Sequence, residues 1–202
     1  MVQQKESVVT PERFASGMTY AEYIASIERN QARFQENYDE MTVASEHVAA
    51  FKALMAKPGG PAKLLVIGED WCPDVFRGMP VFARLAEATG LELRIFKRDE
   101  NKDIMSEFLK DGEFESIPVA VFYTKDMRYL THFIERPDLA YEEMRTTLRP
   151  MYERFRKPDM TDEERAAMRE ENIAFQHGPI WSNWRQETIR QCLAALQAKL
   201  GV

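Results

Sequence analysis

The chain has 202 residues, of which 45% are hydrophobic and 30% are charged, and this composition excludes a disordered protein. Its 27 basic and 33 acidic residues give a formal net charge of -6, which argues against a nucleic-acid-binding surface. No apolar run is long enough to span a membrane, residues 1–6 have no signal-peptide character, and the two cysteines lie far apart, so we expect a cytoplasmic protein without membrane or nucleic-acid partners.

The N-terminal portion, residues 11–57, has the apolar spacing of helices. Thr19 and Glu22 have the spacing of a capping box, which marks a helix start. The pattern predicts one long amphipathic helix over residues 19–40 and a second over residues 45–57. A Pro-Gly-Gly-Pro run ends the second helix.

The central portion, residues 61–137, alternates between short apolar runs and helical spacing in the order β-α-β-α-β-β. We expect strands at 63–67, 91–97, 117–123 and 129–135, and helices at 73–89 and 103–110. The first two strands are joined by a helix, which implies a parallel pair, whereas a short turn between the last two implies an antiparallel hairpin. The predicted fold class is therefore α/β, with a central mixed four-stranded sheet flanked by helices.

The C-terminal portion, residues 138–202, is again helical in pattern. A heptad-like stretch starts at Leu139 and ends near Lys157, and a further helix opens at Thr161. A last helix carries two tryptophans and Cys192 on one apolar stripe. We expect residues 1–202 to form a single domain, and the N-terminal and C-terminal helices could support a homodimer.

The most unusual stretch is GEDWCPDVFRGMP, residues 68–80, at the junction of the first strand and the following helix. Cys72 stands where an N-cap would be, with Pro73 at the first helical position. Unpaired N–H groups at a helix N-terminus lower the pKa of a thiol, which is about 8.5 when free. Asp74 raises the pKa of Cys72 by its like charge, and Arg77 offsets Asp74 in part, so the net shift stays open. An inert, buried cysteine is the alternative.

Four landmarks occur in a fixed order along this central portion. E-D-W-C-P-D at 69–74 is followed by R-D-E-N at 98–101, S-I-P at 116–118 and R-P at 136–137. Together they resemble the thioredoxin superfamily, and most of all a bacterial branch whose active site reads E-D-W-C-x-D-x. The resemblance covers residues 45–137 and implies a thioredoxin-like fold, here with extra N-terminal and C-terminal helices.

The resemblance also implies the layout of a site. It places a cis-proline, Pro118, opposite a nucleophilic Cys72, and the backbone beside that proline pairs with an extended substrate. The catalytic residues it indicates are Cys72, Trp71, Pro118 and Asp74, and the substrate groove is formed by Ile117, Pro73 and Glu69.

One departure from the family pattern bears directly on function. Val75 occupies the place of the second, resolving cysteine, so Cys72 has no local thiol to clear a mixed disulfide. Val66 stands where many thioredoxins carry a buried acid, which leaves Glu69 or Asp74 as the proton acceptor. Cys192 is most simply a core cysteine, with a resolving role as the alternative.

Two functions follow from this site. The first is a single-cysteine thiol–disulfide oxidoreductase that acts on a protein or on a low-molecular-weight thiol or disulfide. The second is a binding or adaptor protein that docks a peptide or partner at the Pro118 groove or on the helical arms. We expect no cofactor and no metal, because the chain has no phosphate-binding glycine motif and no His–Cys pair with metal-ligand spacing.

Overall fold

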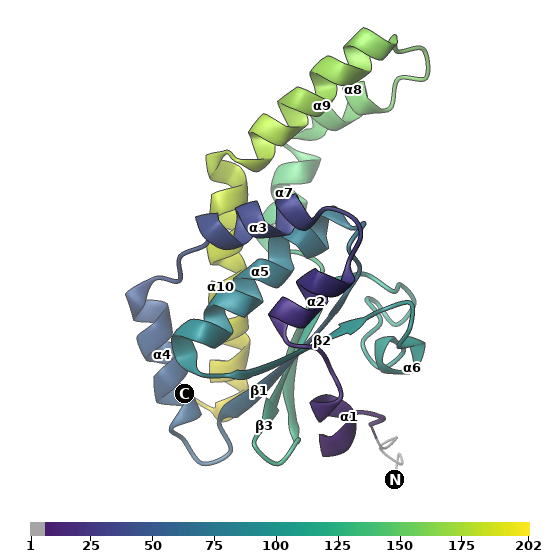
Figure 1. The fold of residues 1–202 in the computed structure, drawn as a ribbon. Helices are drawn as coiled ribbons and strands as arrows, with labels where there is room; N and C mark the ends of the chain where they lie inside the picture. Colours follow the sequence, from purple (N-terminus) through teal and green to yellow (C-terminus); the bar gives the residue numbers. More distant parts are fainter. Residues whose placement is uncertain (1–6) are drawn as a thin grey trace.

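The computed structural model describes residues 7–202 and has a four-stranded sheet in the order β2-β1-β3-β4 at its centre (Figure 1). The strands are β1 (Pro61–Gly68), β2 (Glu92–Lys97), β3 (Val119–Thr124) and β4 (Tyr129–Ile134). β1 runs parallel to β2 and antiparallel to β3, and β3 is antiparallel to β4. The mixed sheet, its parallel β1–β2 pair and its antiparallel β3–β4 hairpin are those predicted from the sequence, whereas the β1–β3 pairing was not predicted. The third strand starts later than predicted, because Pro118 has no N–H to donate to a ladder.

Helices cover both faces of the sheet. Alternate residues of a strand point to opposite faces, so Gly68 and Lys63 face different sides of β1. Gly68 lies under α5 (Pro73–Thr89), where an added Cβ would be 2.7 Å from a methyl group of Val75. The Lys63 ammonium lies 5.0 Å from the centroid of the Phe14 ring in α1 (Pro11–Ala15). α5 and α1 therefore cover opposite faces.

The predicted long helix over residues 19–40 is wrong, because the chain forms two helices there. They are α2 (Tyr20–Ser26) and α3 (Gln31–Glu40). The capping box of Thr19 and Glu22 is present at the start of α2, as predicted. After α2 the chain becomes extended at Ile27, and it turns at Asn30, whose φ of 58° is left-handed. Local spacing favours a continuous helix, and tertiary contacts described below interrupt it.

Two further helices differ from the prediction only in length. α4 (Ser45–Met55) ends two residues earlier than expected. α6 (Lys102–Met105) is a single turn instead of a helix over residues 103–110. Beyond α6 the backbone forms a short loop in which Lys110 and Phe114 exchange N–H···O bonds of 2.9 Å.

The C-terminal portion contains four helices. They are α7 (Asp138–Arg145), α8 (Arg149–Phe155), α9 (Asp162–Gln176) and α10 (Pro179–Leu200). The continuous stretch expected from Leu139 to Lys157 is wrong, because Pro150 cannot donate a backbone hydrogen bond inside a helix and instead occupies the first turn of α8. Thr161 caps α9 as predicted. α8 and α9 project from the body as a hairpin (Figure 1).

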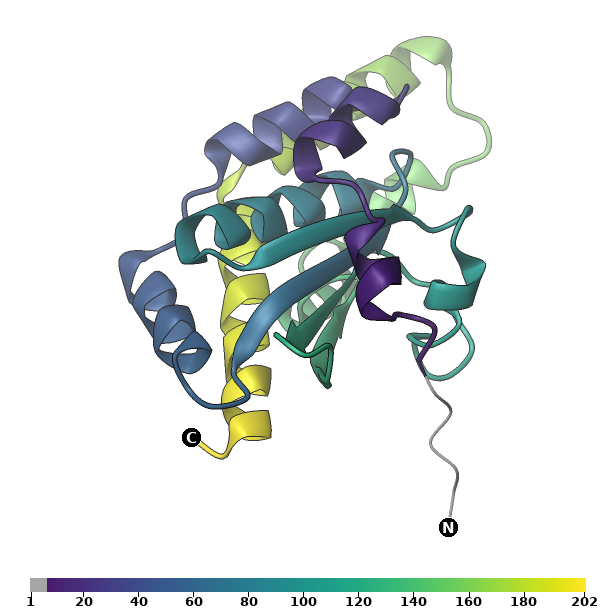
Figure 2. The same ribbon diagram turned by 60° about the horizontal axis from the view of Figure 1, so that its bottom comes forward.

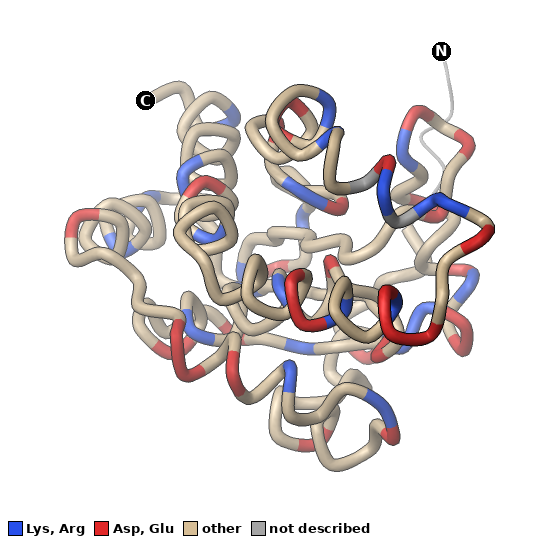
Figure 3. Tube along the Cα trace, turned by 90° about the horizontal axis from the view of Figure 1, so that it is seen from above, with Lys and Arg blue, Asp and Glu red and all other residues tan. Residues whose placement is uncertain are grey.

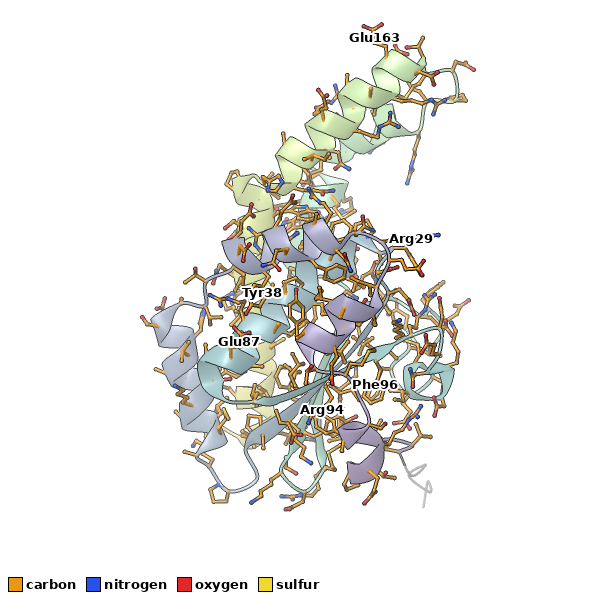
Figure 4. The ribbon with its side chains drawn as sticks, viewed as in Figure 1. Arg29, Tyr38, Glu87, Arg94, Phe96 and Glu163 are labelled. Atoms are coloured by element: carbon orange, nitrogen blue, oxygen red, sulfur yellow. The ribbon has the colours of Figure 1, made fainter. Side chains whose placement is uncertain are left out.

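The N-terminal and C-terminal helices pack against α5 and against each other. α3 lies along α5, and α10 crosses α5 and also contacts α4 and β4 (Figure 2). Tyr38 of α3 and Glu87 of α5 point toward one another and are hydrogen-bonded (Figure 4). Arg185 of α10, whose side chain is 3% exposed, donates to Asn37 at 2.8 Å and to Glu40 at 2.9 Å in α3. Helices from the two ends of the chain thus contact each other as well as α5, with α10 also packed on β4.

Charges of both signs are interspersed along the trace (Figure 3). Several neighbouring helix positions form local ion pairs, such as Arg84 with Glu87 at 3.2 Å and Arg190 with Glu187. Exposed pairs of this kind contribute about 0–1 kcal/mol each, so they add little to the stability of the fold.

Candidate active site

Cys72 is the N-cap of α5, as the sequence predicts. Its backbone is extended, with φ of -89° and ψ of 124°, and Pro73 occupies the first turn. The Cys72 carbonyl accepts hydrogen bonds from the N–H groups of Val75 at 3.0 Å and Phe76 at 3.1 Å. The thiol is therefore held at the positive end of the helix dipole, where anions are favoured.

The Cys72 sulfur faces the segment before β3. Its Sγ lies 3.8 Å from the carbonyl oxygen of Ile117, and the Ile117–Pro118 peptide bond is cis. The Ile117 side chain is buried, so its carbonyl, and not its side chain, faces the thiol. Gly78 of α5 allows this approach, because a Cβ at that position would lie 3.1 Å from Cγ of Pro118.

Opposing effects act on the Cys72 thiol. Burial is the largest, and it raises the pKa of Cys72 above its ordinary value. The negative charge of Asp74 raises the pKa further, whereas the backbone N–H groups of Val75 and Asp74 and the guanidinium of Arg136 lower it in part. The net shift in the pKa of Cys72, which the sequence left open, is therefore upward.

Asp74 lies between two arginines. Its Oδ1 accepts from Arg77 at 3.1 Å, the pair expected from the i,i+3 spacing, and its Oδ2 accepts from Arg136. Arg136 was not predicted as a partner of Asp74, although it is part of the R-P landmark. Nor does the sequence indicate that Arg77 is completely buried. Asp74 is therefore a charge-neutralising residue as well as a neighbour of the thiol.

Asp70 joins the active-site loop to the N-terminal helices. Its carboxylate accepts hydrogen bonds from the backbone N–H groups of Glu28 at 3.3 Å and Arg29 at 3.0 Å. The Asn30 amide donates to the Asp70 carbonyl at 2.8 Å. The Arg29 side chain itself extends away from the body (Figure 4). These contacts account for the break between α2 and α3, because helical residues could not present their N–H groups to Asp70.

Trp71 and Glu69, close to Cys72 in the chain, differ in exposure. Trp71 is 43% exposed, and the Arg98 guanidinium lies 5.0 Å from the centroid of its ring. Glu69 is buried, and its Oε1 accepts from the backbone N–H of Asp99 at 2.7 Å. Burial raises the pKa of Glu69. The Trp71 ring is thus partly exposed next to Cys72 with Arg98 over one face, whereas Glu69 faces inward.

Val75, which stands in place of a resolving cysteine, and Cys192, the other cysteine of the chain, are both buried. Val75 is fully buried and packs on Gly68. Cys192 is 2% exposed in α10 and borders a cavity with β4, and burial raises the pKa of its thiol strongly. Both cysteines are free. This environment fits the interpretation of Cys192 as a core residue.

Among residues 7–202, no group of three or more His, Cys, Asp or Glu side chains is placed to hold a metal ion. Within the same residues, no helix combines the length and apolarity needed to cross a membrane.

These features define a class of protein. A helix N-terminal cysteine after the first strand of a mixed sheet, facing a proline before the third, is the arrangement of a thioredoxin-like protein. A family model described as thioredoxin matches residues 17–171, and the chain therefore belongs to the thioredoxin family. The match extends beyond residues 45–137 in both directions, so it includes α2 and α3 and reaches into α9.

Two solved structures share the fold. A protein of unknown function from Pseudomonas aeruginosa superposes with a TM-score of 0.65 at 16% identity, covering 94% of this chain and 98% of that one. An HIV epitope scaffold superposes with a TM-score of 0.63 at 17% identity, covering 94% of this chain and 99% of that one. These likenesses confirm the α/β fold class, flanking helices included. No functionally curated protein matches the chain.

Proposed function

We propose that this thioredoxin-family chain is a single-cysteine thiol–disulfide oxidoreductase with Cys72 as its nucleophile. The observation that supports this most is the position of the Cys72 sulfur, at the N-terminus of α5 and 3.8 Å from the Ile117 carbonyl oxygen. The thiol is only partly buried, so a disulfide can reach it.

The exchange needs no cofactor. The Cys72 thiolate attacks one sulfur of a substrate disulfide, the S–S bond breaks, and the other sulfur leaves as a thiolate that takes a proton from water. A second thiol from solution then attacks the substrate sulfur of the mixed disulfide and releases Cys72. Because Val75 supplies no local thiol, this second thiol is a low-molecular-weight thiol or another protein. Two free cysteines suit such exchange in a reducing cytoplasm.

Among the neighbouring carboxylates, Glu69 is the better candidate for accepting the thiol proton. Asp74 is engaged by two guanidiniums, whereas burial raises the pKa of Glu69 and so brings its basicity closer to that of the thiol. In this proposal the exposed Trp71 ring and Pro73 line the groove, and the Ile117–Pro118 backbone receives the substrate.

A second candidate function is that of a binding or adaptor protein. The observation that favours it is the raised pKa of Cys72, since such a thiol is seldom ionised at neutral pH and leaves slowly once it is in a disulfide. In this case the Pro118 groove or the helical arms hold a partner, which for the arms includes a second copy of the chain.

The first prediction concerns the reactivity of Cys72. In a Cys192→Ser background, the rate of alkylation by iodoacetamide should rise with pH and reach half its maximum above the pH found for an unstructured cysteine peptide, because burial raises the pKa. The double variant Cys72→Ser/Cys192→Ser is the control for background labelling. A Cys72 that reacts in denaturant but not in the folded protein would overturn the oxidoreductase proposal.

Turnover separates the two candidate functions. An oxidoreductase should reduce many equivalents of a peptide–glutathione mixed disulfide in the presence of excess glutathione. An adaptor should form at most one mixed disulfide per chain, and its Cys72→Ser variant should still bind its partner.

A further inference from the structure

A cavity of about 280 Å³ adjoins the Cys72 site on the side of the C-terminal helices. The two residues after Cys72 form part of its wall, together with residues that follow β4 and residues of α9 and α10. They are Pro73, Asp74, Arg136, Met144, Asn172 and Phe175, with Gln176, Trp181 and Trp184 completing the lining. The C-terminal helices therefore add a concave surface next to the thiol.

The far wall of this cavity is aromatic. The Phe175 ring makes edge-to-face contacts with Trp181 and Trp184, at centroid distances of 6.4 Å and 6.2 Å. Trp181 also packs on Phe76 of α5, at 6.2 Å. The indole N–H of Trp184 donates a hydrogen bond to the Glu143 carboxylate. Such a wall favours contact with an apolar or aromatic group.

The charges that border the cavity are already paired. Asp74 accepts from two arginines, and Arg136 binds Asp74 and Glu135 through Nη2, while its buried Nε has no partner among the described residues. The side-chain amide oxygen Oε1 of Gln176 accepts a hydrogen bond from Arg33. An ionised guest would lose its hydration and would find the Asp74 carboxylate and Nη2 of Arg136 already in ion pairs, so a neutral guest is favoured.

The size of the cavity limits the guest further. Drug-sized ligands occupy pockets of about 300–1,000 Å³, whereas a cavity of about 150 Å³ accepts a benzene ring. A volume of about 280 Å³ therefore suits one large side chain.

We propose that this cavity is a specificity pocket that receives an aromatic or large aliphatic side chain of a peptide substrate. That side chain lies close in the peptide sequence to the cysteine whose sulfur Cys72 attacks. The inference rests on the proposed function of Cys72, since Pro73 and Asp74 belong to both sites. It goes beyond that function by naming the substrate as a polypeptide with an apolar residue close to its reactive cysteine.

Peptides with one cysteine in a mixed disulfide with 5-thio-2-nitrobenzoate test the proposal. The Cys72 thiolate attacks the peptide sulfur, a new S–S bond forms, and the coloured thionitrobenzoate leaves with the electron pair of the broken bond. A single Phe is placed in turn at each of the three positions before and after the cysteine of an Ala-based peptide. In the Cys192→Ser background, at least one Phe position should raise the second-order rate about tenfold over the Ala peptide.

Two variants of α9 test whether the preference for the Phe peptide over the Ala peptide arises in this cavity. Asn172→Phe fills the cavity from its own wall and should bring the Phe-to-Ala rate ratio close to one. Ala174→Phe places the same ring on the exposed side of the same helix and should keep the full ratio. The ratio compares two peptides on one variant, so a general change in Cys72 reactivity cancels. A full ratio in Asn172→Phe would overturn the pocket.

The two proposals can fail separately. If every peptide releases thionitrobenzoate at the same rate, Cys72 is reactive and the pocket is wrong. If no peptide reacts, the oxidoreductase proposal fails, and the pocket is then tested by binding of the Phe and Ala peptides, with serine in place of cysteine, to the Cys72→Ser variant. Equal affinities there would overturn the pocket, and about tenfold tighter binding of the Phe peptide would support it.

Discussion

Arg77 is a fully buried arginine beneath the active site. Its Nη2 donates to Asp74 at 3.1 Å and to the Glu135 carbonyl at 3.3 Å, and its guanidinium lies 5.7 Å from the centroid of the Trp184 ring. Its Nε and Nη1 have no partner among the described residues. Burial lowers the pKa of Arg77, and the Asp74 carboxylate opposes that shift. Asp74 is thus the counterion that makes this burial tolerable.

Asp74→Asn should change both the thiol and the stability. Removal of a like charge should lower the pKa of Cys72, as read from the pH dependence of its alkylation. The same change leaves Arg77 buried without its counterion, and should reduce the free energy of unfolding in urea by about 3 kcal/mol. Asp99→Asn, which removes an exposed carboxylate paired with Arg98, is the control. An unchanged or higher pKa of Cys72 in Asp74→Asn would contradict this account.

At the scale of elements, the connection between α2 and α3 is held in place by hydrogen bonds to the active-site loop. Local apolar spacing predicts an uninterrupted helix, whose N–H groups would bond within the helix. In the folded chain, two of these N–H groups turn to the carboxylate of Asp70 instead. The left-handed Asn30 completes the turn. The loop that carries Trp71 and Cys72 is therefore supported from outside the sheet.

Asp70→Ala should loosen this connection. Loss of the acceptor for two backbone N–H groups should reduce the free energy of unfolding by about 1–2 kcal/mol. Amide exchange at residues 28–30 should become faster than in the parent chain. Asp70→Asn keeps one carbonyl oxygen and should retain part of the protection. Unchanged exchange in Asp70→Ala would show that the connection is held by other contacts.

At the scale of the whole molecule, the two ends of the chain stabilise each other. Arg185 of α10 is nearly buried and binds Asn37 and Glu40 of α3. His177, between α9 and α10, also contacts Glu40, at 2.6 Å. Burial alone would raise the pKa of Glu40, but its hydrogen bonds with His177 and Arg185 outweigh burial and lower it. Helices that flank the sheet in sequence thus bind each other directly at one end of α3.

Arg185→Leu should therefore be strongly destabilising. The change leaves Asn37 and Glu40 without their buried partner, and should reduce the free energy of unfolding by about 3 kcal/mol in urea titrations. Arg190→Leu, at an exposed position of the same helix, should change it by less than about 1 kcal/mol. Equal effects of the two substitutions would mean that α3 and α10 are not coupled through Arg185.

What the sequence by itself determined is local. The capping boxes at Thr19 and Thr161, and Cys72 followed by Pro73 at the start of α5, depend on residues within one helical turn. The parallel β1–β2 pair and the antiparallel β3–β4 hairpin follow from connection lengths in the same way, whereas the pairing of β1 with β3 does not. The pairing of Cys72 with the Ile117–Pro118 segment came from the family resemblance, since spacing alone carries no sign of it.

Only the tertiary structure decided what surrounds the thiol. Asp74 meets Arg136 across 62 positions of sequence, and Asp70 meets Glu28 across 42. The raised pKa of Cys72, the break before α3 and the cavity beside Pro73 all result from such distant contacts. Local propensity is set by neighbours within a turn, whereas burial and charge pairing depend on which distant segments the fold brings together.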